Sequence, residues 1–324
     1  MYCIDNRFVP FCSFVFFSSR EAICQTHGFL PLMSEVEHVL AINNKLGEGP
    51  VWCSEEQALY WVDIESNCFY RMYPTSMKYE VFEVGLPIGA LALRASGGLI
   101  MATKSGFAFW DTQKGLRLIA DPEAHKPHTR FNDGAVDCQG RFWAGTMCGL
   151  SEMCEEPEGC LYRLDPDGSI HTMETGLKIS NGIGWSPDNK IMYLTDSPKH
   201  MIYEYDFDPL TGAIENRRPF IYTPDEHGIP DGLAVDSEGF IWSVRWGDWK
   251  IIRFDPTGKA EREIQLPIQY PTSCTFGGER LDELYITSAW TALSEEQKKK
   301  QPGAGDLFRI KTDLIGLVKS KFVG

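Results

Sequence analysis

Four side chains that carry oxygen atoms occupy similar places in a repeated pattern, each at the start of a short apolar segment. They are Glu48, Asn132, Asn181 and Asp231. Glu48 and Asp231 offer carboxylates, and Asn181 offers an amide oxygen. If the fold brings the two carboxylates together, their repulsion raises a pKa unless a positive charge lies between them. Ligand sets made only of oxygen favour Ca²⁺, Mg²⁺ or Mn²⁺, so the pattern indicates a site for a hard divalent cation.

Arg130 stands two residues before Asn132 in the stretch Arg130-Phe131-Asn132-Asp133-Gly134. Alternation along an extended segment puts both side chains on one side, which favours a pair that binds an anion or a hydroxyl group. A surface ion pair is the alternative for Arg130. Asn-Gly and Asp-Gly are also common turn dipeptides, so a turn-forming role is the alternative for the other candidates. We favour a binding site because the residues recur in register across the repeats.

Other site chemistries find no support in the sequence. It contains no G-x-S-x-G nucleophile motif and no Walker or Rossmann glycine loop. His125, His128, His200 and His227 lack the i,i+4 or H-x-H spacing of metal ligands. The ten cysteines include no C-x-x-C pair. We therefore expect reduced thiols that pack as small hydrophobic side chains, and a cytoplasmic protein.

The charge and hydropathy of the chain exclude two classes of partner. Its net charge of −14 argues against nucleic acid, because phosphate binding requires a basic patch. No apolar run approaches the ~20 residues that a membrane-spanning helix needs. Residues 1–32 show none of the repeat pattern, so we expect a disordered leader or an over-extended reading frame there. A secretory leader is the alternative, because a short apolar run follows Arg7.

The elements that must position the candidate residues are short strands in a repeat of roughly 40–50 residues, a period typical of propellers. Six units begin near Gly47, Ile88, Asn132, Asn181, Asp231 and Thr272. Each alternates apolar and polar residues, with Asp-Pro and Asp-Gly turns between strands. We predict an all-β fold for residues 33–324, a six-bladed β-propeller closed into a single ring. Residues 39–42 should complete the last blade beside residues 307–310, and residues 294–298 should form a helical turn within it.

Several motifs resemble the gluconolactonase, regucalcin and luciferin-regenerating-enzyme family of six-bladed propellers. The resemblance runs from about residue 46 to about residue 311. The most specific motifs are Leu46-Gly47-Glu48-Gly49-Pro50-Val51-Trp52, Arg130-Phe131-Asn132-Asp133-Gly134, Gly145-Thr146-Met147, Ser180-Asn181-Gly182 and Pro230-Asp231-Gly232.

This resemblance implies one divalent ion, of Ca, Mn, Mg or Zn, held by Glu48, Asn181 and Asp231. It also implies substrate contacts from Arg130 and Asn132, and a catalytic role for Asp231 in assisting the attacking water. The activity implied is hydrolysis of a small-molecule sugar lactone to the aldonic acid. Two alternatives stay open: another metal-dependent esterase or lactonase, and a non-catalytic calcium-binding propeller of the regucalcin type.

One departure from the family pattern concerns the choice of sugar. Animal members carry a substrate-contacting Glu shortly after the Gly-Thr-Met motif. The aligned position in this chain is Leu150, and Glu152 lies only nearby. Trp246-Gly247-Asp248 resembles the bacterial sugar-lactonase members more than the animal ones.

Overall fold

The computed structural model describes residues 35–149 and 157–324 of the chain. The predicted leader, Leu150 and Glu152 all lie outside the described residues. Among those described, no helix is long and apolar enough to cross a membrane. Within the described ranges, the cysteines with free thiols are Cys53, Cys68, Cys138, Cys160 and Cys274, and all except Cys138 are buried. Cys148 is disulfide-bonded, so the expectation that the thiols are reduced is wrong for this residue.

The described strands form six antiparallel sheets of four strands each. Blade 1 contains β2 (Gly47–Cys53), β3 (Ala58–Asp63), β4 (Cys68–Tyr73) and β5 (Lys78–Glu83). Blade 2 contains β6 (Ile88–Leu93), β7 (Leu99–Thr103), β8 (Gly106–Asp111) and β9 (Gly115–Ala120). Blade 3 contains β10 (Thr129–Val136), β11 (Phe142–Cys148), β12 (Gly159–Leu164) and β13 (Ile170–Leu177).

The remaining blades follow the same plan. Blade 4 contains β14 (Ser180–Trp185), β15 (Ile191–Asp196), β16 (Met201–Phe207) and β17 (Ile214–Tyr222). Blade 5 contains β18 (Ile229–Val235), β19 (Ile241–Trp246), β20 (Lys250–Phe254) and β21 (Ala260–Gln265). Blade 6 contains β22 (Pro271–Gly277), β23 (Glu283–Ser288), β24 (Leu307–Lys311) and β1 (Val36–Leu40).

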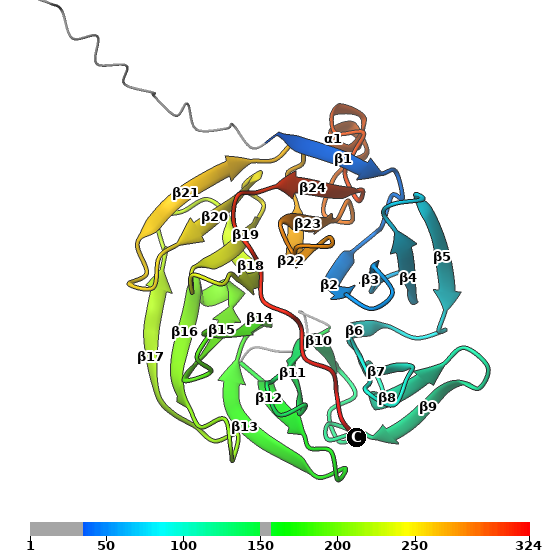
Figure 1. The fold of residues 1–324 in the computed structure, drawn as a ribbon, viewed down its shortest axis with the longest axis vertical. Coiled ribbons are helices and arrows are strands. Elements are labelled where there is room, and N and C mark those ends of the chain that lie inside the picture. The colour runs from blue at the N-terminus through cyan, green and yellow to red at the C-terminus, as the bar shows by residue number, and fades with distance from the viewer. Residues whose placement is uncertain (1–34, 150–156) are drawn as a thin grey trace, which may run out of the picture. The chain divides into compact units, whose positions relative to one another are not determined.

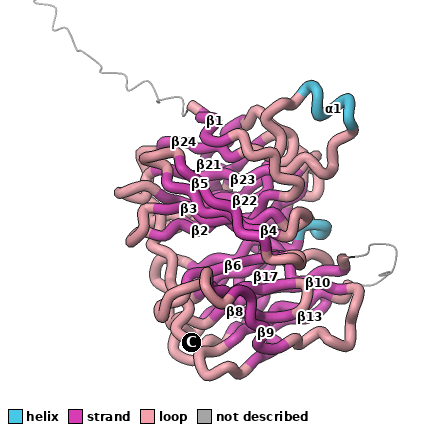
Figure 2. The backbone as a smooth tube through the Cα atoms, turned by 90° about the vertical axis from the view of Figure 1, so that its right-hand side faces the viewer, coloured by secondary structure: helices cyan, strands magenta, loops and turns pink. Residues whose placement is uncertain are grey.

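The six blades surround a common axis, which confirms the predicted propeller (Figure 1). Strands β2, β6, β10, β14, β18 and β22 contact one another from blade to blade, so they are the innermost strands. Helix α1 (Glu295–Lys300) begins after Ser294, whose side chain accepts a hydrogen bond from the backbone N–H of Gln297. None of its residues is buried, and in Figure 2 the helix projects from the opposite face to the C-terminus.

The ring closes within blade 6, where the first described strand pairs with the last one. Val36 in β1 lies opposite Ile310 in β24, and Leu40 lies opposite Leu307. The predicted pairing is therefore confirmed, although the strand begins before residue 39 and ends at Leu40. Strand β1 ends at Leu40 because the backbone N–H groups that follow form hydrogen bonds with a side chain and not with β24. The N–H of Ile42 donates to Oδ1 of Asp306 at 2.9 Å.

The apolar core is divided among the six interfaces between adjacent blades. Trp143 of blade 3 meets Trp185 of blade 4 edge to face, with ring centroids 6.0 Å apart. Trp52 of blade 1 stacks on Tyr285 of blade 6, with centroids 5.8 Å apart. The interface between the last blade and the first is thus packed like the others, because a single blade cannot bury both of its faces alone.

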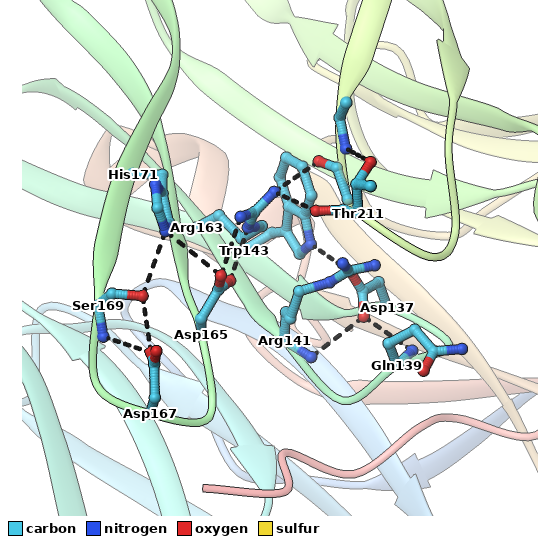
Figure 3. A network of polar contacts seen from close by, with 12 residues as sticks. Asp137, Gln139, Arg141, Trp143, Arg163, Asp165, Asp167, Ser169, His171 and Thr211 are labelled. Atoms are coloured by element: carbon cyan, nitrogen blue, oxygen red, sulfur yellow. Dashed lines mark hydrogen bonds and ion pairs between the residues drawn. The ribbon is translucent and has the colours of Figure 1, made fainter.

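Polar contacts join blade 3 to blade 4 beside this core (Figure 3). The carboxylate of Asp137 is fully buried. It accepts hydrogen bonds from Nε1 of Trp143 at 2.9 Å and from Nε of Arg141 at 2.6 Å. The same guanidinium donates through Nη2 to the backbone oxygen of Pro209 in the loop between β16 and β17, at 2.7 Å. The charge of Asp137, which follows β10, is therefore neutralised by Arg141, and Arg141 also binds the backbone of the next blade.

Arg163 makes a second bridge to that loop. Its Nη1 donates to the backbone oxygens of Gly212 at 2.7 Å and Thr211 at 3.1 Å. Its Nε donates to Oδ1 of Asp165 at 2.6 Å. Gly212 has a φ of +70°, which glycine adopts without strain, and a Cβ atom there would lie 2.6 Å from this guanidinium, so a larger residue would displace the arginine.

We expect Arg163→Met to lower the free energy of unfolding by about 2 kcal/mol, because buried carbonyl oxygens and the Asp165 carboxylate lose a charged donor. The measurement is the urea midpoint of the purified protein. Arg218→Met is the matched control, since Arg218 pairs with Glu204 and Asp206 on an exposed part of the surface. That control should cost at most about 1 kcal/mol, and equal losses in the two variants would contradict the role of the bridge.

Candidate metal centre

The pairing of the innermost strands with the next strands of their blades becomes irregular at the candidate residues. Their register shifts lie between Glu48 and Val51, Phe131 and Asp133, Asn181 and Ile183, and Pro230 and Leu233. A β-bulge leaves a residue unpaired, bends the strand and re-aims a side chain. Each blade that supplies a candidate residue therefore supplies it from an irregularity near the start of its inner strand.

Buried aspartates hold the loops that lead into two of these strands. Oδ1 of Asp63, at the end of β3, accepts a hydrogen bond from the backbone N–H of Leu46 at 3.1 Å. Oδ1 of Asp196, at the end of β15, accepts one from the backbone N–H of Ile179 at 3.2 Å. Both aspartates are almost fully inaccessible to solvent. The backbone that precedes Glu48 and Asn181 is thus fixed by the neighbouring strand.

Glycines let the inner strands approach one another. A Cβ atom on Gly182 would lie 2.8 Å from the backbone oxygen of Asp231 and 2.7 Å from the backbone nitrogen of Leu233. A Cβ atom on Gly89 would lie 2.4 Å from the backbone oxygen of Phe131. These distances are shorter than any normal contact, so the spacing around the axis requires glycine at both positions.

Three buried carboxylates from three different blades influence one another at this end of the axis. They belong to Glu48, Asp133 and Asp231. Burial, and then the negative charge of Asp133, raise the pKa of Glu48 to about 8. Burial, followed by the charges of Glu48 and Asp133, holds the pKa of Asp231 well above its usual range. Burial also raises the pKa of Asp133 to about 6. Each shift has the direction expected where like charges lack a cation.

The amide and guanidinium candidates form a hydrogen-bonded chain beside these carboxylates. Nη1 of Arg130 donates to Oδ1 of Asn132 at 2.8 Å. Nδ2 of Asn132 donates to Oδ1 of Asn181 at 3.1 Å, and Nδ2 of Asn181 donates to Oγ of Ser197 at 2.9 Å. Arg130 also acts electrostatically on Glu48. The structure therefore brings all five predicted site residues into one neighbourhood, with the amide oxygen of Asn181 oriented by its neighbours.

The residues present fit a hard divalent cation. Oδ1 of Asp231 is buried and has no hydrogen-bond partner, which is costly for a carboxylate unless something positive meets it. Glu48, Asn181 and Asp231 supply only oxygen, the ligand type that Ca²⁺, Mg²⁺ and Mn²⁺ prefer. No group of three or more His, Cys, Asp or Glu side chains in the described ranges is arranged as a metal site. The expected set needs only two carboxylates, because its third member is an amide.

Asp133 is the member of this neighbourhood that sequence reasoning missed. Strict alternation from Asn132 would turn its side chain away from the axis, but the bulge in β10 places it among the other carboxylates. A signal for it does exist in the repeats. If the units are aligned on the glycine, Asp133-Gly134 is the counterpart of Asn181-Gly182 and Asp231-Gly232.

Arg130 also borders a pocket of about 220 Å³ between blades 2 and 3. Glu123 and Lys126 line the same pocket, and Nζ of Lys126 lies 3.6 Å from Oε1 of Glu123. Oε1 of Glu123 accepts hydrogen bonds from Thr146 and Tyr162 at 3.1 Å each. A polar molecule held by Arg130 would therefore find further charged groups on this side.

Comparison with known proteins agrees with this fold. Residues 46–290 match the model of the family described as "SMP-30/Gluconolactonase/LRE-like region". The chain is 38% identical to regucalcin of Xenopus laevis over 296 residues, which covers 90% of this chain and 99% of that protein. It is 36% identical to human regucalcin over 281 residues, covering 85% of this chain and 94% of the relative.

Two solved structures are similar in three dimensions. A luciferin-regenerating enzyme superposes with a TM-score of 0.84 at 30% identity, covering 90% of this chain and all of the other. A protein from Agrobacterium tumefaciens, described as a calcium-binding protein, regucalcin, superposes with a TM-score of 0.85 at 26% identity. That match covers 89% of this chain and 97% of the other. The chain is therefore a member of the SMP-30/gluconolactonase/luciferin-regenerating-enzyme-like family.

Proposed function

We propose that this protein is a divalent-metal-dependent lactonase that opens a sugar lactone to the aldonic acid. The observation that carries the proposal is the set of buried carboxylates from blades 1, 3 and 5, which influence one another and leave an oxygen of Asp231 without a partner. A structural turn would not need buried charge at these positions. Membership in a family named for gluconolactonase supports a lactone as the substrate class.

Glu48, Asn181 and Asp231 would hold the cation. When bound, the cation would act as a Lewis acid on the lactone carbonyl and would lower the pKa of an adjacent water. Its charge would also favour the ionised form of Asp231, whose pKa is raised in its absence by burial and by neighbouring charges.

An ionised Asp231 is suited to act as the general base. It would take a proton from the water whose oxygen attacks the carbonyl carbon. Cleavage of the bond between that carbon and the ring oxygen opens the lactone, and the ring oxygen takes up the proton that Asp231 accepted from the water. Arg130 and Asn132 lie beside this position and already share a hydrogen bond. They would orient the hydroxyl groups or the ring oxygen of the sugar.

A second candidate function is calcium binding without catalysis. The similar protein from Agrobacterium tumefaciens is described as calcium-binding, and the same oxygen ligands would serve such a role. The Arg130–Asn132 pair and the adjacent pocket favour an enzyme, because a site that only holds calcium needs neither. A lactone assay with and without chelator separates the two functions. Removal of metal should abolish hydrolysis of gluconolactone, and Mn²⁺, Ca²⁺ or Mg²⁺ should restore it to different degrees.

We expect Asp231→Asn to abolish turnover even at saturating metal, because the substitution keeps one oxygen ligand but removes the proton acceptor. The measurement is kcat for gluconolactone, corrected for spontaneous ring opening, together with the metal content per chain. Asn181→Asp is the matched variant at a neighbouring ligand. It should keep the metal and part of the activity, because a carboxylate still coordinates a hard cation. Full activity in Asp231→Asn, or in metal-free wild type, would overturn the mechanism.

We expect Arg130→Ala to lower kcat/KM by roughly ten- to hundredfold, since a hydrogen bond from a charged group is worth ~1.5–3 kcal/mol. Metal binding should not weaken, because Arg130 contributes no ligand and its charge opposes the cation. Steady-state kinetics with gluconolactone and calorimetric titration with metal test the two statements separately. A variant that binds metal less tightly than wild type would place Arg130 in the ligand set instead.

A further inference from the structure

The C-terminal segment, residues 312–324, crosses the face of the ring at which the inner strands end. Near blades 5 and 6, the backbone N–H of Gly316 donates to the oxygen of Leu281 at 2.8 Å. In the same region, the backbone N–H of Ser237 donates to the oxygen of Ile315 at 2.8 Å. The segment is therefore tied to one side of the ring before it reaches the axis.

Its far end is tied to the other side of the ring. The backbone N–H of Phe322 donates to the oxygen of Leu93 at 2.9 Å, and the N–H of Ala95 donates to the oxygen of Phe322 at 2.8 Å. Nη2 of Arg94 donates to the backbone oxygen of Gly324 at 3.1 Å. Residues 317–321 span the space between these attachments, and the red trace in Figure 1 passes across the middle of the ring.

A small cavity of about 40 Å³ lies inside the ring above this segment. Inner-strand residues from all six blades line it, and they include Pro50, Leu91, Asp133, Ile183, Leu233 and Cys274. The remaining lining residues are Lys319 and Ser320 of the C-terminal segment. The cavity is large enough to hold ordered water. It joins the carboxylate of Asp133 to the lysine of the segment that closes the ring.

Lys319 has no hydrogen bond or ion pair with another described residue. Lys319 is exposed to solvent, and it also borders a wider pocket on the face where the segment runs. The charge of Lys319 acts to lower the pKa of Asp133. Arg130 and Lys319 thus act on the carboxylates from opposite directions, the first on Glu48 and the second on Asp133.

We propose that the C-terminal segment is part of the metal centre, and that Lys319 supplies a positive charge of the chain itself that sets how tightly the site holds a divalent ion. The inference rests on the metal site of the proposed function. A permanent positive charge below the carboxylates offsets their mutual repulsion when no metal is present. The same charge repels an incoming cation. Both effects weaken metal binding, so Lys319 keeps the ion exchangeable while the carboxylates stay in place.

Calorimetric titration of metal-free protein with Ca²⁺ and with Mn²⁺ tests the proposal. Lys319→Met keeps the length of the side chain and removes its charge, so the Kd for both ions should fall roughly tenfold. The rise in Tm on adding metal should grow accordingly, because a ligand that binds only the folded state stabilises it by RT ln(1 + [L]/Kd), which increases as Kd falls. Lys319→Arg keeps the charge and should bind both ions like wild type.

Lys321→Met is the matched control in the same segment. Nζ of Lys321 pairs with Oε1 of Glu55 at 2.7 Å, away from the cavity. This control should leave both Kd values unchanged. If wild type binds metal and Lys319→Met binds it equally or less tightly, the inference is overturned while the metal site stands. If wild type binds neither ion and its lactonase activity survives chelation, the proposed function itself is overturned.

Discussion

Carboxylates of like charge, buried together near the axis of a closed ring, are the constraint on which the rest of this structure depends. Glu48, Asp133 and Asp231 would separate if their backbones were free to move, because burial strengthens their repulsion. Buried aspartates hold the loops before the inner strands, and glycines let those strands approach. The fold thus holds these side chains together against their mutual repulsion.

The propeller is well suited to that task because its stability lies away from the axis. Each interface between blades has its own apolar core, including the one between blade 6 and blade 1. Polar bridges such as those of Arg141 and Arg163 add further links between neighbours. Charges at the centre can therefore be retained for chemistry, since the hydrophobic burial that holds the ring together does not pass through them.

The two faces of the ring differ in what they offer. On the face where the inner strands begin, Arg130 meets Asn132 and borders an open pocket. On the opposite face, the C-terminal segment crosses the axis and places Lys319 beneath Asp133. Under the proposed function, a substrate would approach from the Arg130 side, because the C-terminal segment crosses the opposite face of the ring. Under the proposed function, Arg130 would act on the substrate and Lys319 on the metal.

The sequence by itself determined the repeat and the strand class, and it predicted most residues of the candidate site, because those features are written in local patterns. Short alternating segments with Asp-Pro and Asp-Gly turns predict blades, and the residues before the recurring glycines include Glu48, Asn181 and Asp231. Pairing of the last blade with a segment near the start was predictable too. The paired strand is Val36–Leu40, however, because the backbone that follows it forms hydrogen bonds with Asp306.

Only the tertiary structure decided which side chains share the centre. Regular alternation of side chains along a strand places Asp133 on the wrong side of β10. The bulge that changes its side depends on how β10 pairs with β11. Lys319 belongs to no repeat, so no pattern connects it with residues nearly two hundred positions earlier. Its place follows from the hydrogen bonds that tie the C-terminal segment to Leu281 and Leu93 on opposite sides of the ring. Local sequence determines which residues can do chemistry, whereas closure of the ring decides which of them meet.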